Sequence, residues 1–512
     1  MIKNKGRGKV GNNLQFFLED AIFQYGNRTA YQFQKKRYRY KDIDLLSNQL
    51  ANALNSHDIF LGDRIGVLTN NPIHNIITYL AALKIGAVCV PLNPGQDQMI
   101  VNDIKKDSKI KSFIVDEKMY EFYQPSTFQE QSVFSLESLQ DSSSVCDLKD
   151  IQCFSTDYIS LDIEDNNESF IFFTSGSTGV KKGVVLQRKS LLEFIKWGGD
   201  FLEVKPNDKF LCHAPLYFDM SLFSLFIPFF SGGMCVLTSN DQRNNPRYLN
   251  QLIKEEQVNI LHLVPSSLKL LLNEKNQDYK SVRFLGLAGE ALPSGDIQEV
   301  RGAFKYTDIV NFYGSTEVNE ALAFSLPKDV EGMESLPIGK PLKHVEVRVL
   351  NQDLFPCKDG EVGELYVNSS TMLKCYVNKS IDTTFKFLDD NLKVKYFPTG
   401  DLVKFENDLF HYMGRKDDMV KIQGKRVYLS EVRDIVSNHK AINEVFVCMY
   451  EGSLISIVSS NTAINSLEMR VYCSIYLEPH AIPSKFIFME DHLPKTSTGK
   501  IDRKLLQECL GG

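Results

Sequence analysis

The chain has 512 residues, 43% of them hydrophobic and 24% charged, which is the composition of an ordinary folded protein with several domain-sized units. The 58 basic and 64 acidic residues give a net charge of -6, so the chain has no overall basic field and we expect no nucleic-acid partner. The ten cysteines form no Cys-x-x-Cys pair and do not cluster with histidine, which argues against a zinc site or a disulfide framework and fits a cytoplasmic location.

Two features of the sequence argue against a membrane partner. The basic N-terminus runs on into Gly11, Asn12 and Asn13 rather than into an apolar segment, so it is not a secretory signal. The longest apolar run, Met220–Phe230, is about half the length that a bilayer crossing needs. We expect this run to form a buried helix.

The first part of the chain alternates between strand and helix periods. Ile65–Leu68, Val88–Leu92 and Phe113–Val115 are short apolar runs typical of buried strands. Pro72–Ile85 and Met99–Asp107 have the spacing of helices. Strands separated by helices of this length predict parallel pairing with right-handed crossovers, and therefore an α/β sheet that is covered on both faces.

The rest of the chain changes in texture three times. Residues 120–168 are rich in Ser, Gln and Asp and predict a surface connection with some short structure. A second α/β stretch runs from residue 170 to about residue 310, and alternating runs within residues 345–412 predict a mostly antiparallel unit. From Gly414 onward the pattern predicts a small α+β domain. The predicted fold class is thus α/β, with a large N-terminal domain of α/β sheets, a β-rich subdomain and a small, mobile α+β C-terminal domain.

A glycine-rich loop follows the buried-strand run Phe170–Phe173. Residues 174–184 combine three glycines, several hydroxyls and two lysines. The glycines let backbone N–H groups face one point, and the hydroxyls and lysines add donors and positive charge, so the loop suits a phosphate group. The spacing is not that of a Walker A loop, and for such a loop by itself a solvated turn is the alternative interpretation.

Four further motifs follow this loop in order, at Asn311–Glu317, Phe397–Asp401, Gly414–Gly424 and Pro494–Lys504. Together with the glycine-rich loop, they resemble the motifs of the adenylate-forming superfamily, which includes acyl- and aryl-CoA ligases, luciferases and the adenylation domains of nonribosomal peptide synthetases. Two positions depart from the pattern of that family, because Lys181 and Ser315 stand where proline is common.

The resemblance implies that the protein activates a carboxylate with ATP and Mg²⁺. Attack of a carboxylate on the α-phosphorus brings two anions together, so the site needs positioned cations and donors. The resemblance implies that Lys500 is the catalytic ammonium, that Thr316 lies against the α-phosphate and that Glu317 binds Mg²⁺. Without the motifs, Lys500 is a solubilising lysine and Glu317 is a surface carboxylate.

The resemblance also implies contacts to the nucleotide. Tyr313 would stack on adenine, Asp401 would accept hydrogen bonds from the ribose hydroxyls, and Arg415 would hold ribose or phosphate. The alternatives are an ordinary core aromatic for Tyr313 and a turn carboxylate for Asp401. The implied ATP-binding residues are Thr174, Ser175, Gly176, Ser177, Thr178, Gly179, Lys182, Asn311, Tyr313, Gly314, Asp401 and Arg415.

The motif at Gly414–Gly424 implies a division of the chain into moving parts. The resemblance implies a large N-terminal AMP-binding domain (residues 1–413), a hinge (residues 414–418) and a small C-terminal domain (residues 419–512) that rotates between two half-reactions. Asp417 would be the pivot, and a helix-start carboxylate is an equal alternative. Gly424 would line the tunnel through which a phosphopantetheine thiol arrives, where a side chain would obstruct it.

Residues 214–221 resemble the segment of the family that contacts the acid substrate. In members that activate amino acids, an aspartate at the position of Asp219 pairs with the α-ammonium, and a buried carboxylate needs such a partner. The alternative is that Asp219 caps the apolar helix that follows it. Glu320 either meets a polar or basic side chain of the substrate or faces solvent. The implied substrate-binding residues are Asp219, Met220, Phe223, His262, Gly286, Ala288, Phe312, Glu320 and Ala321.

The predicted function is the ATP-dependent activation of an amino acid as its aminoacyl-AMP, with release of pyrophosphate, followed by thioester transfer to a phosphopantetheine thiol. The length and the Asp219 motif resemble D-alanine or prolyl carrier-protein ligases, and no phosphopantetheine-attachment motif follows Lys504, so we expect a separate carrier protein. The nearest alternative is an acyl- or aryl-CoA synthetase with coenzyme A as the acceptor. A catalytically silent binding protein is a second alternative, to which the two departures from the family pattern give some weight. The presence of Glu317, Asp401 and Lys500 argues against it.

Overall fold

The structure is a computed structural model that describes most of the chain, in the ranges given at the end of this paragraph. No helix within these ranges has both the length and the apolar composition that crossing a bilayer requires. The described residues are 13–128, 131–137, 145–159, 161–175, 181–274, 279–290, 292, 296–330, 336–379, 384–388, 394–422, 425–450, 452–477, 479–490, 492–495 and 501–510.

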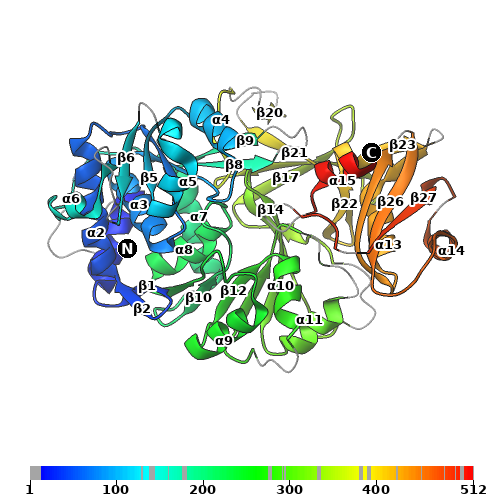
Figure 1. Cartoon of the computed structure of the whole chain (residues 1–512). Coiled ribbons are helices and arrows are strands. Elements are labelled where there is room, and N and C mark those ends of the chain that lie inside the picture. Colours follow the sequence, from blue (N-terminus) through cyan, green and yellow to red (C-terminus); the bar gives the residue numbers. More distant parts are fainter. Residues whose placement is uncertain are drawn as a thin grey trace.

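An eight-stranded sheet occupies one side of the large N-terminal part of the molecule, with the strand order β19-β9-β8-β4-β3-β5-β6-β7 (Figure 1). Its centre, β3 (Arg64–Leu68), β4 (Val88–Pro91) and β5 (Ile110–Val115), is parallel, which confirms the predicted pairing. The crossover helix α3 (Pro72–Ile85) begins after the Asn71 cap because Pro72 has a fixed φ suited to the first turn. The remaining elements here are α4 (Gln98–Ser108), α5 (Glu117–Thr127), α6 (Leu148–Gln152), β6 (Ser132–Ser135), β7 (Val145–Cys146), β8 (Glu168–Ser175), β9 (Lys181–Gln187) and β19 (Cys375–Tyr376).

Two parts of this sheet add detail that the sequence did not provide. Residues 120–168 contribute more than a surface connection, because β6 and β7 extend the sheet in parallel. These strands are too short to show a clear periodic pattern in the sequence. The strands on either side of the glycine-rich loop are antiparallel, and β8 and β9 pair Thr174 with Lys182 at the end of the ladder.

A nine-stranded sheet lies beside the first, with the order β16-β15-β14-β13-β12-β10-β11-β1-β2. The six neighbouring strands β1, β11, β10, β12, β13 and β14 pair in parallel. The next strand, β15, is antiparallel to β14. The strands are β1 (Thr29–Phe33), β2 (Lys36–Arg39), β10 (Lys209–Cys212), β11 (Met234–Leu237), β12 (Ile260–Leu263), β13 (Phe284–Leu287), β14 (Asp308–Ser315), β15 (Asn319–Ser325) and β16 (Lys340–Pro341). The helices are α1 (Leu14–Tyr25), α2 (Tyr40–Ser56), α7 (Arg188–Phe201), α8 (Ser221–Ser231), α9 (Pro246–Glu256), α10 (Pro265–Leu272) and α11 (Ile297–Ala303).

The apolar helix α8 lies in the main core, which confirms the prediction of a buried helix for this run. Its aromatic side chains Phe223 and Phe226 are buried in a cluster that also contains Phe170 of the first sheet. The helix packs closely against α7 because Gly198 has no side chain, and a Cβ there would lie 2.2 Å from Ile227 Cδ1. Since α8 follows directly on the Asp219 segment, this packing fixes the position of that segment.

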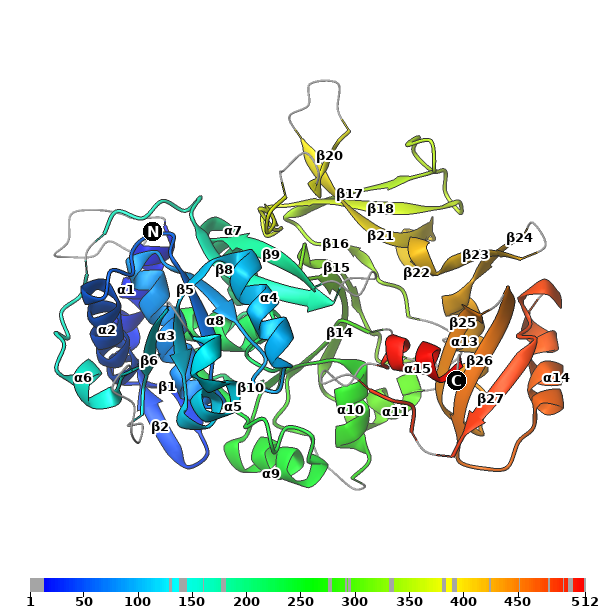
Figure 2. The same cartoon turned by 45° about the horizontal axis from the view of Figure 1, so that its top comes forward.

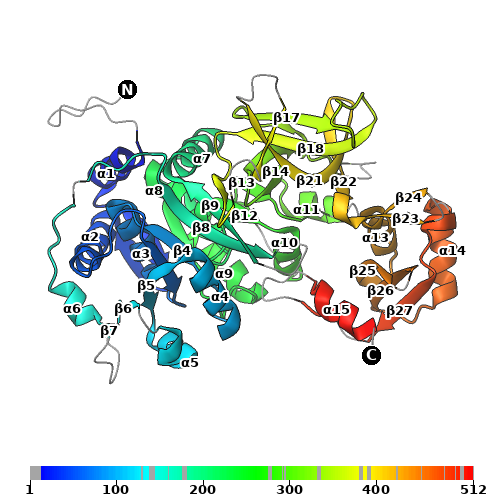
Figure 3. The ribbon, with the colours of Figure 1, turned by 90° about the horizontal axis from the view of Figure 1, so that it is seen from above.

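The last part of the chain forms a β-rich unit and a small α+β unit, as the sequence predicts (Figures 2 and 3). The β-rich unit is antiparallel and contains β17 (Val345–Leu350), β18 (Val362–Ser369), β20 (Lys386–Phe387), β21 (Lys395–Glu406) and β22 (Leu409–Arg415). The C-terminal unit contains η2 (Lys416–Asp418), β23 (Met419–Ile422), β24 (Lys425–Tyr428), α13 (Leu429–Ser437), β25 (Ile442–Tyr450), β26 (Ser453–Ser460), α14 (Ser466–Tyr476), η3 (Pro479–Ala481), β27 (Lys485–Met489) and α15 (Arg503–Leu510). The predicted fold class is therefore confirmed.

Candidate active site

The turn between β14 and β15 carries several of the predicted site residues. Thr316 and Glu317 lie in the turn itself, and Tyr313 and Gly314 end the strand before it. The pairing register shifts between Tyr313 and Gly314, and a Cβ on Gly314 would lie 2.0 Å from the carbonyl oxygen of Asn319. Only glycine allows this close approach of two backbones, and it thereby sets the direction in which the turn projects its side chains.

A network of paired charges joins β14 to β21 and β22. The Tyr313 hydroxyl donates to one carboxylate oxygen of Asp401, and Arg415 Nη1 donates to the other over 2.9 Å. Arg415 Nη1 also donates to the carbonyl oxygen of Thr399 over 2.6 Å. Burial raises the pKa of Asp401 above its ordinary value, and the Tyr313 hydroxyl and the Arg415 guanidinium oppose that rise. The structure thus brings together three predicted nucleotide contacts that are distant in the sequence.

The Glu317 carboxylate lies beside a second network. Its Oε1 accepts a hydrogen bond of 2.8 Å from the Tyr376 hydroxyl, and Lys182 Nζ lies 5.8 Å from the centroid of the Tyr376 ring. Within the described residues, no group of three or more His, Cys, Asp or Glu side chains could hold a metal ion. A single carboxylate nevertheless fits Mg²⁺, because this ion commonly takes one or two protein carboxylates and completes its shell with substrate phosphates and water.

Tyr376 is a contact that the sequence reasoning missed. It lies 59 residues beyond Glu317 in a segment to which no motif was assigned. Its strand β19 pairs with β9, so that Tyr376 lies opposite Val184 and close to Lys182. No local sequence pattern predicts this contact, because only the pairing of two distant strands brings the Tyr376 hydroxyl to Glu317.

The Asp219 carboxylate lies at the other end of the site, next to Thr316. Met220, and not Asp219, is the N-cap residue of α8, so the structure does not support the helix-cap alternative. Burial raises the pKa of Asp219 to about 6, a hydrogen bond from Thr316 opposes the rise, and the charge of Glu317 adds to it. A carboxylate in this position is stabilised by any cation that binds against it.

Three aromatic rings from α8, β12 and β14 form a wall behind Asp219. The rings of Phe223 and His262 stack with centroids 4.1 Å apart, and the His262 and Phe312 centroids are 6.0 Å apart. Between them, Gly286 has no room for a side chain, because a Cβ would lie 2.8 Å from His262 Cδ2 and 3.1 Å from Phe312 Cε2. Of the other predicted substrate residues, Ala288 and Ala321 are buried and Met220 is partly buried.

Glu320 does not face solvent, which removes one of the two alternatives that the sequence left open. Its side chain is 12% exposed, and its Oε1 lies 3.4 Å from His262 Nε2. Burial, followed by the charge of Asp219, raises the pKa of Glu320 to about 8. Burial lowers the pKa of His262 to about 3, so this imidazole is neutral at ordinary pH.

Several predicted site residues lie outside the described residues. These are Gly176, Ser177, Thr178 and Gly179 of the glycine-rich loop, Gly424 and Lys500. The strand ends on either side of the loop are described, and they pair Thr174 with Lys182 and Ser175 with Lys181. Asn311 is buried and donates from Nδ2 to the carbonyl oxygen of Pro337 over 2.9 Å. Asp417 lies in η2, 3.6 Å from Arg415 Nη2.

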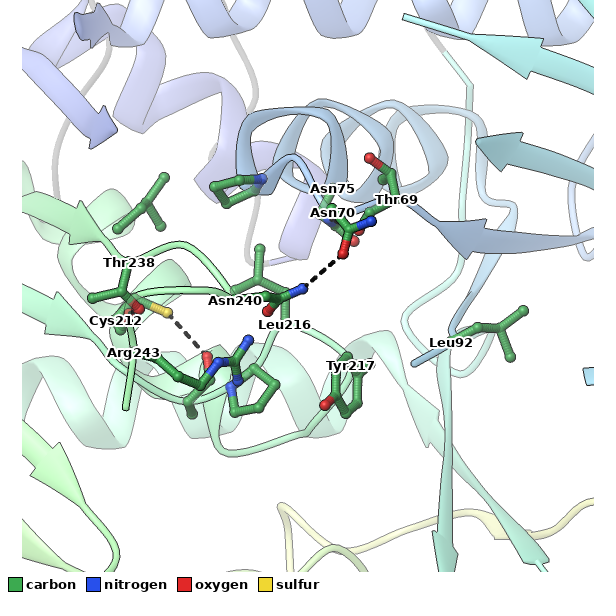
Figure 4. Close-up of a pocket in the computed structure, with 14 residues that line it drawn as sticks. Thr69, Asn70, Asn75, Leu92, Cys212, Leu216, Tyr217, Thr238, Asn240 and Arg243 are labelled. Carbon is green, nitrogen blue, oxygen red and sulfur yellow. Dashed lines mark hydrogen bonds between the residues drawn. The ribbon is translucent and has the colours of Figure 1, made fainter. Parts of the chain in front are cut away.

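A small cavity lies between the two sheets, next to the chain segment that leads to Asp219 (Figure 4). Tyr217, Thr238 and Arg243 are among its lining residues, and Asn240 Nδ2 donates to Asn70 Oδ1 across it over 3.1 Å. Its described lining includes none of the predicted site residues.

The comparisons with known proteins agree on one family. A family model described as AMP-binding enzyme matches residues 18–377. Gramicidin S synthase 2 of Aneurinibacillus migulanus is 26% identical over 506 residues, which cover 97% of this chain and 11% of that protein. The L-proline--[L-prolyl-carrier protein] ligase of Pseudomonas fluorescens is 26% identical over 506 residues, which cover 96% of this chain and 98% of that protein. The chain thus spans about a tenth of the first of these relatives and nearly all of the second.

A solved structure shares the fold. The anthranilate CoA ligase AuaEII, in complex with anthranoyl-AMP, superposes with a TM-score of 0.86 at 22% identity, over 98% of both chains. At this level of identity the likeness concerns the arrangement of the elements only.

Proposed function

We propose that this chain, which belongs to the AMP-binding enzyme family, activates an amino acid as its aminoacyl-AMP and transfers the aminoacyl group to the phosphopantetheine thiol of a separate carrier protein. The observation that carries the proposal is the closeness of the Thr316 side chain to the buried Asp219 carboxylate, whose pKa Thr316 lowers against the effect of burial. It brings the turn that would face the α-phosphate to the carboxylate that would hold an α-ammonium. An amino acid placed against Asp219 therefore has its own carboxylate next to the proposed phosphate site.

The first half-reaction forms an acid anhydride. A carboxylate oxygen of the amino acid attacks the α-phosphorus of ATP, a C–O–P bridge forms, and the bond to the β-phosphate breaks with release of pyrophosphate. Asp219 would hold the α-ammonium, and Thr316 would donate toward the α-phosphate as negative charge builds up there. Such positioning converts an encounter of two anions into a reaction within one bound complex.

The nucleotide would be held by the network of Tyr313, Asp401 and Arg415. Asp401 has lone pairs left beyond its bonds to Tyr313 and Arg415, and these can accept the ribose hydroxyls. The Tyr313 ring would stack on adenine. Glu317 would hold Mg²⁺ together with phosphate oxygens, and the bound ion would supply positive charge to the departing pyrophosphate.

The remaining assignments are proposals that rest on the motifs. Lys500 would place its ammonium between the substrate carboxylate and the α-phosphate. Asp417 would be the pivot between a domain of residues 1–413 and one of residues 419–512, and Gly424 would leave room for the incoming thiol. In the second half-reaction this thiol attacks the acyl carbon, a thioester forms, AMP leaves and the thiol proton passes to solvent.

The choice of a carrier protein as acceptor is supported by the relative of matching length. That relative is a ligase named for the L-prolyl-carrier protein, and this chain covers 98% of its length. The AMP-binding family as such does not decide between a carrier protein and coenzyme A. Incubation of the preformed aminoacyl-AMP with either thiol, followed by mass measurement of the thioester, separates the two.

The test of the proposal is ATP–pyrophosphate exchange with all twenty amino acids, D-alanine, and a set of fatty and aryl acids. We expect exchange with an amino acid and little with its analogue that lacks the α-amino group. Asp219→Asn should lower kcat/KM for the amino acid on the order of 100-fold, because it removes one partner of a desolvated ion pair. The same variant should leave the weak activity with the desamino analogue unchanged, and a preference for fatty or aryl acids would instead favour the CoA synthetase alternative.

A further inference from the structure

The acid end of the site holds two partly buried carboxylates from different elements, Asp219 in the segment before α8 and Glu320 on β15. The charge of Asp219 contributes to the raised pKa of Glu320, so the two groups act on each other electrostatically. Among the ion pairs of the described residues, none includes Asp219, and the one that includes Glu320 has His262 as its partner. One ammonium group of a substrate neutralises only one of these two carboxylates.

His262 is the second observation that points to a ligand. Its side chain is 1% exposed, and within the described part of the chain neither ring nitrogen has a hydrogen-bond partner. The ring stacks on Phe223, and its Nε2 faces Glu320 Oε1 at 3.4 Å without the geometry of a hydrogen bond. A buried imidazole without a partner is costly, and a neutral ring offers one N–H donor and one acceptor nitrogen. A cationic N–H group at this place would bond the acceptor nitrogen and would also bring positive charge to Glu320.

The rings also limit the length of the substrate side chain. His262 and Phe312 fill the space over Gly286, where an added carbon would lie 2.8 Å and 3.1 Å from them. A long side chain that extends past Glu320 toward β13 would meet these rings. The cationic group must therefore stop at Glu320, which favours a chain of few carbons.

We propose that the substrate is a short diamino acid, whose α-ammonium pairs with Asp219 and whose second ammonium lies between Glu320 and His262. The inference rests on the proposed function, because that proposal assigns the α-ammonium to Asp219. The second ammonium donates one hydrogen bond to the Glu320 carboxylate and one to a His262 ring nitrogen. Both carboxylates are then paired, and one of the two unpartnered ring nitrogens of His262 gains a donor.

The experiment measures ATP–pyrophosphate exchange by the full chain with matched pairs of amino acids that differ only in the second amino group. The pairs are 2,3-diaminopropionate with alanine, 2,4-diaminobutyrate with 2-aminobutyrate, and ornithine with norvaline, each as both enantiomers. We expect kcat/KM for at least one diamino acid to exceed that for its matched monoamino acid on the order of 100-fold, because only the diamino acid forms the second buried ion pair. This comparison uses the wild-type protein and so does not depend on the folding of a variant.

A variant then locates the second ammonium. Glu320→Gln keeps the shape of the side chain and should lower kcat/KM for the diamino acid on the order of 100-fold. The matched monoamino acid should change little, and its residual exchange reports that the variant is folded. Glu121→Gln makes the same chemical change at an exposed position on α5 and should alter neither substrate.

The outcomes separate this inference from the function on which it rests. Exchange with a neutral amino acid in preference to every diamino acid leaves the proposed function standing and overturns the inference. A diamino acid that Glu320→Gln uses as well as wild type does the same, because its second ammonium then binds elsewhere. If no amino acid supports exchange while a fatty or aryl acid does, the proposed function and the inference both fall.

Discussion

The two ends of the candidate site differ in how their charges are partnered. At the nucleotide end, Asp401 is held by Tyr313 and Arg415, and Glu317 accepts a hydrogen bond from Tyr376. At the acid end, Asp219 has no ion-pair partner among the described residues, and the basic side chain nearest to Glu320 in the ion pairs of those residues is the neutral imidazole of His262. A site whose donors are already in place suits a ligand of fixed shape, whereas a site whose carboxyl groups lack a cationic partner is completed by a cationic ligand. The contrast supports the proposal that ATP binds at the first end and that the second selects among acids.

The substitution with the largest expected effect on activity lies at the nucleotide end of the site. Glu317→Gln removes the proposed Mg²⁺ ligand and should lower kcat about 100- to 1000-fold with every acid, because it weakens a charge interaction with the reacting phosphates. Pyrophosphate exchange over a Mg²⁺ titration measures this loss, with Glu121→Gln as the control. A loss confined to amino acids would place Glu317 at the acid end and break the comparison.

A smaller effect is expected from the hydroxyl that orients Glu317. Tyr376→Phe removes one hydrogen bond of 2.8 Å and should lower kcat/KM about 5- to 10-fold, the equivalent of about 1 kcal/mol. The Mg²⁺ concentration for half-maximal activity should rise, which a purely structural role would not produce. The matched control is Tyr306→Phe, since Tyr306 is 82% exposed and should tolerate the change. An unchanged Mg²⁺ requirement would contradict the assignment.

The smallest expected effect concerns stability and the acid end. The pKa of Glu320 is raised to about 8 in the folded protein, above its unfolded value, so the folded state keeps a proton that the unfolded state releases. The contribution of Glu320 to stability is therefore complete near pH 4 and is lost as the pH rises toward 8. Glu320→Gln cannot ionise, so its unfolding midpoint should equal that of wild type near pH 4 and exceed it at pH 8.5.

Thermal unfolding across this pH range measures the difference, with Glu121→Gln as the control. A variant that is less stable than wild type at pH 8.5 would mean that the Glu320 carboxylate already has a cationic partner in the free protein. Addition of the preferred diamino acid should reverse the order, because the ligand stabilises the ionised wild type and not the variant.

Much of the fold was predictable because its signals are local. The helix at Pro72–Ile85 has a capping residue, a proline in its first turn and a glycine with φ of 72° after its last turn, and the structure places it at the predicted bounds. The strands β6 and β7 were not predicted, because they are only a few residues long and become strands by pairing with β5 and with each other.

The sequence by itself determined the family, the fold class and the set of motifs, because glycine turns, apolar runs and charged motif residues are local properties of the chain. Only the tertiary structure decided which charges meet. The approach of Tyr376 to Glu317 needs the pairing of β19 with β9, and the burial of Glu320 beside His262 needs β15 and β12 to lie in one sheet. Electrostatic interactions depend on distance in space, and the sequence around each of two residues far apart in the chain does not predict the distance between them.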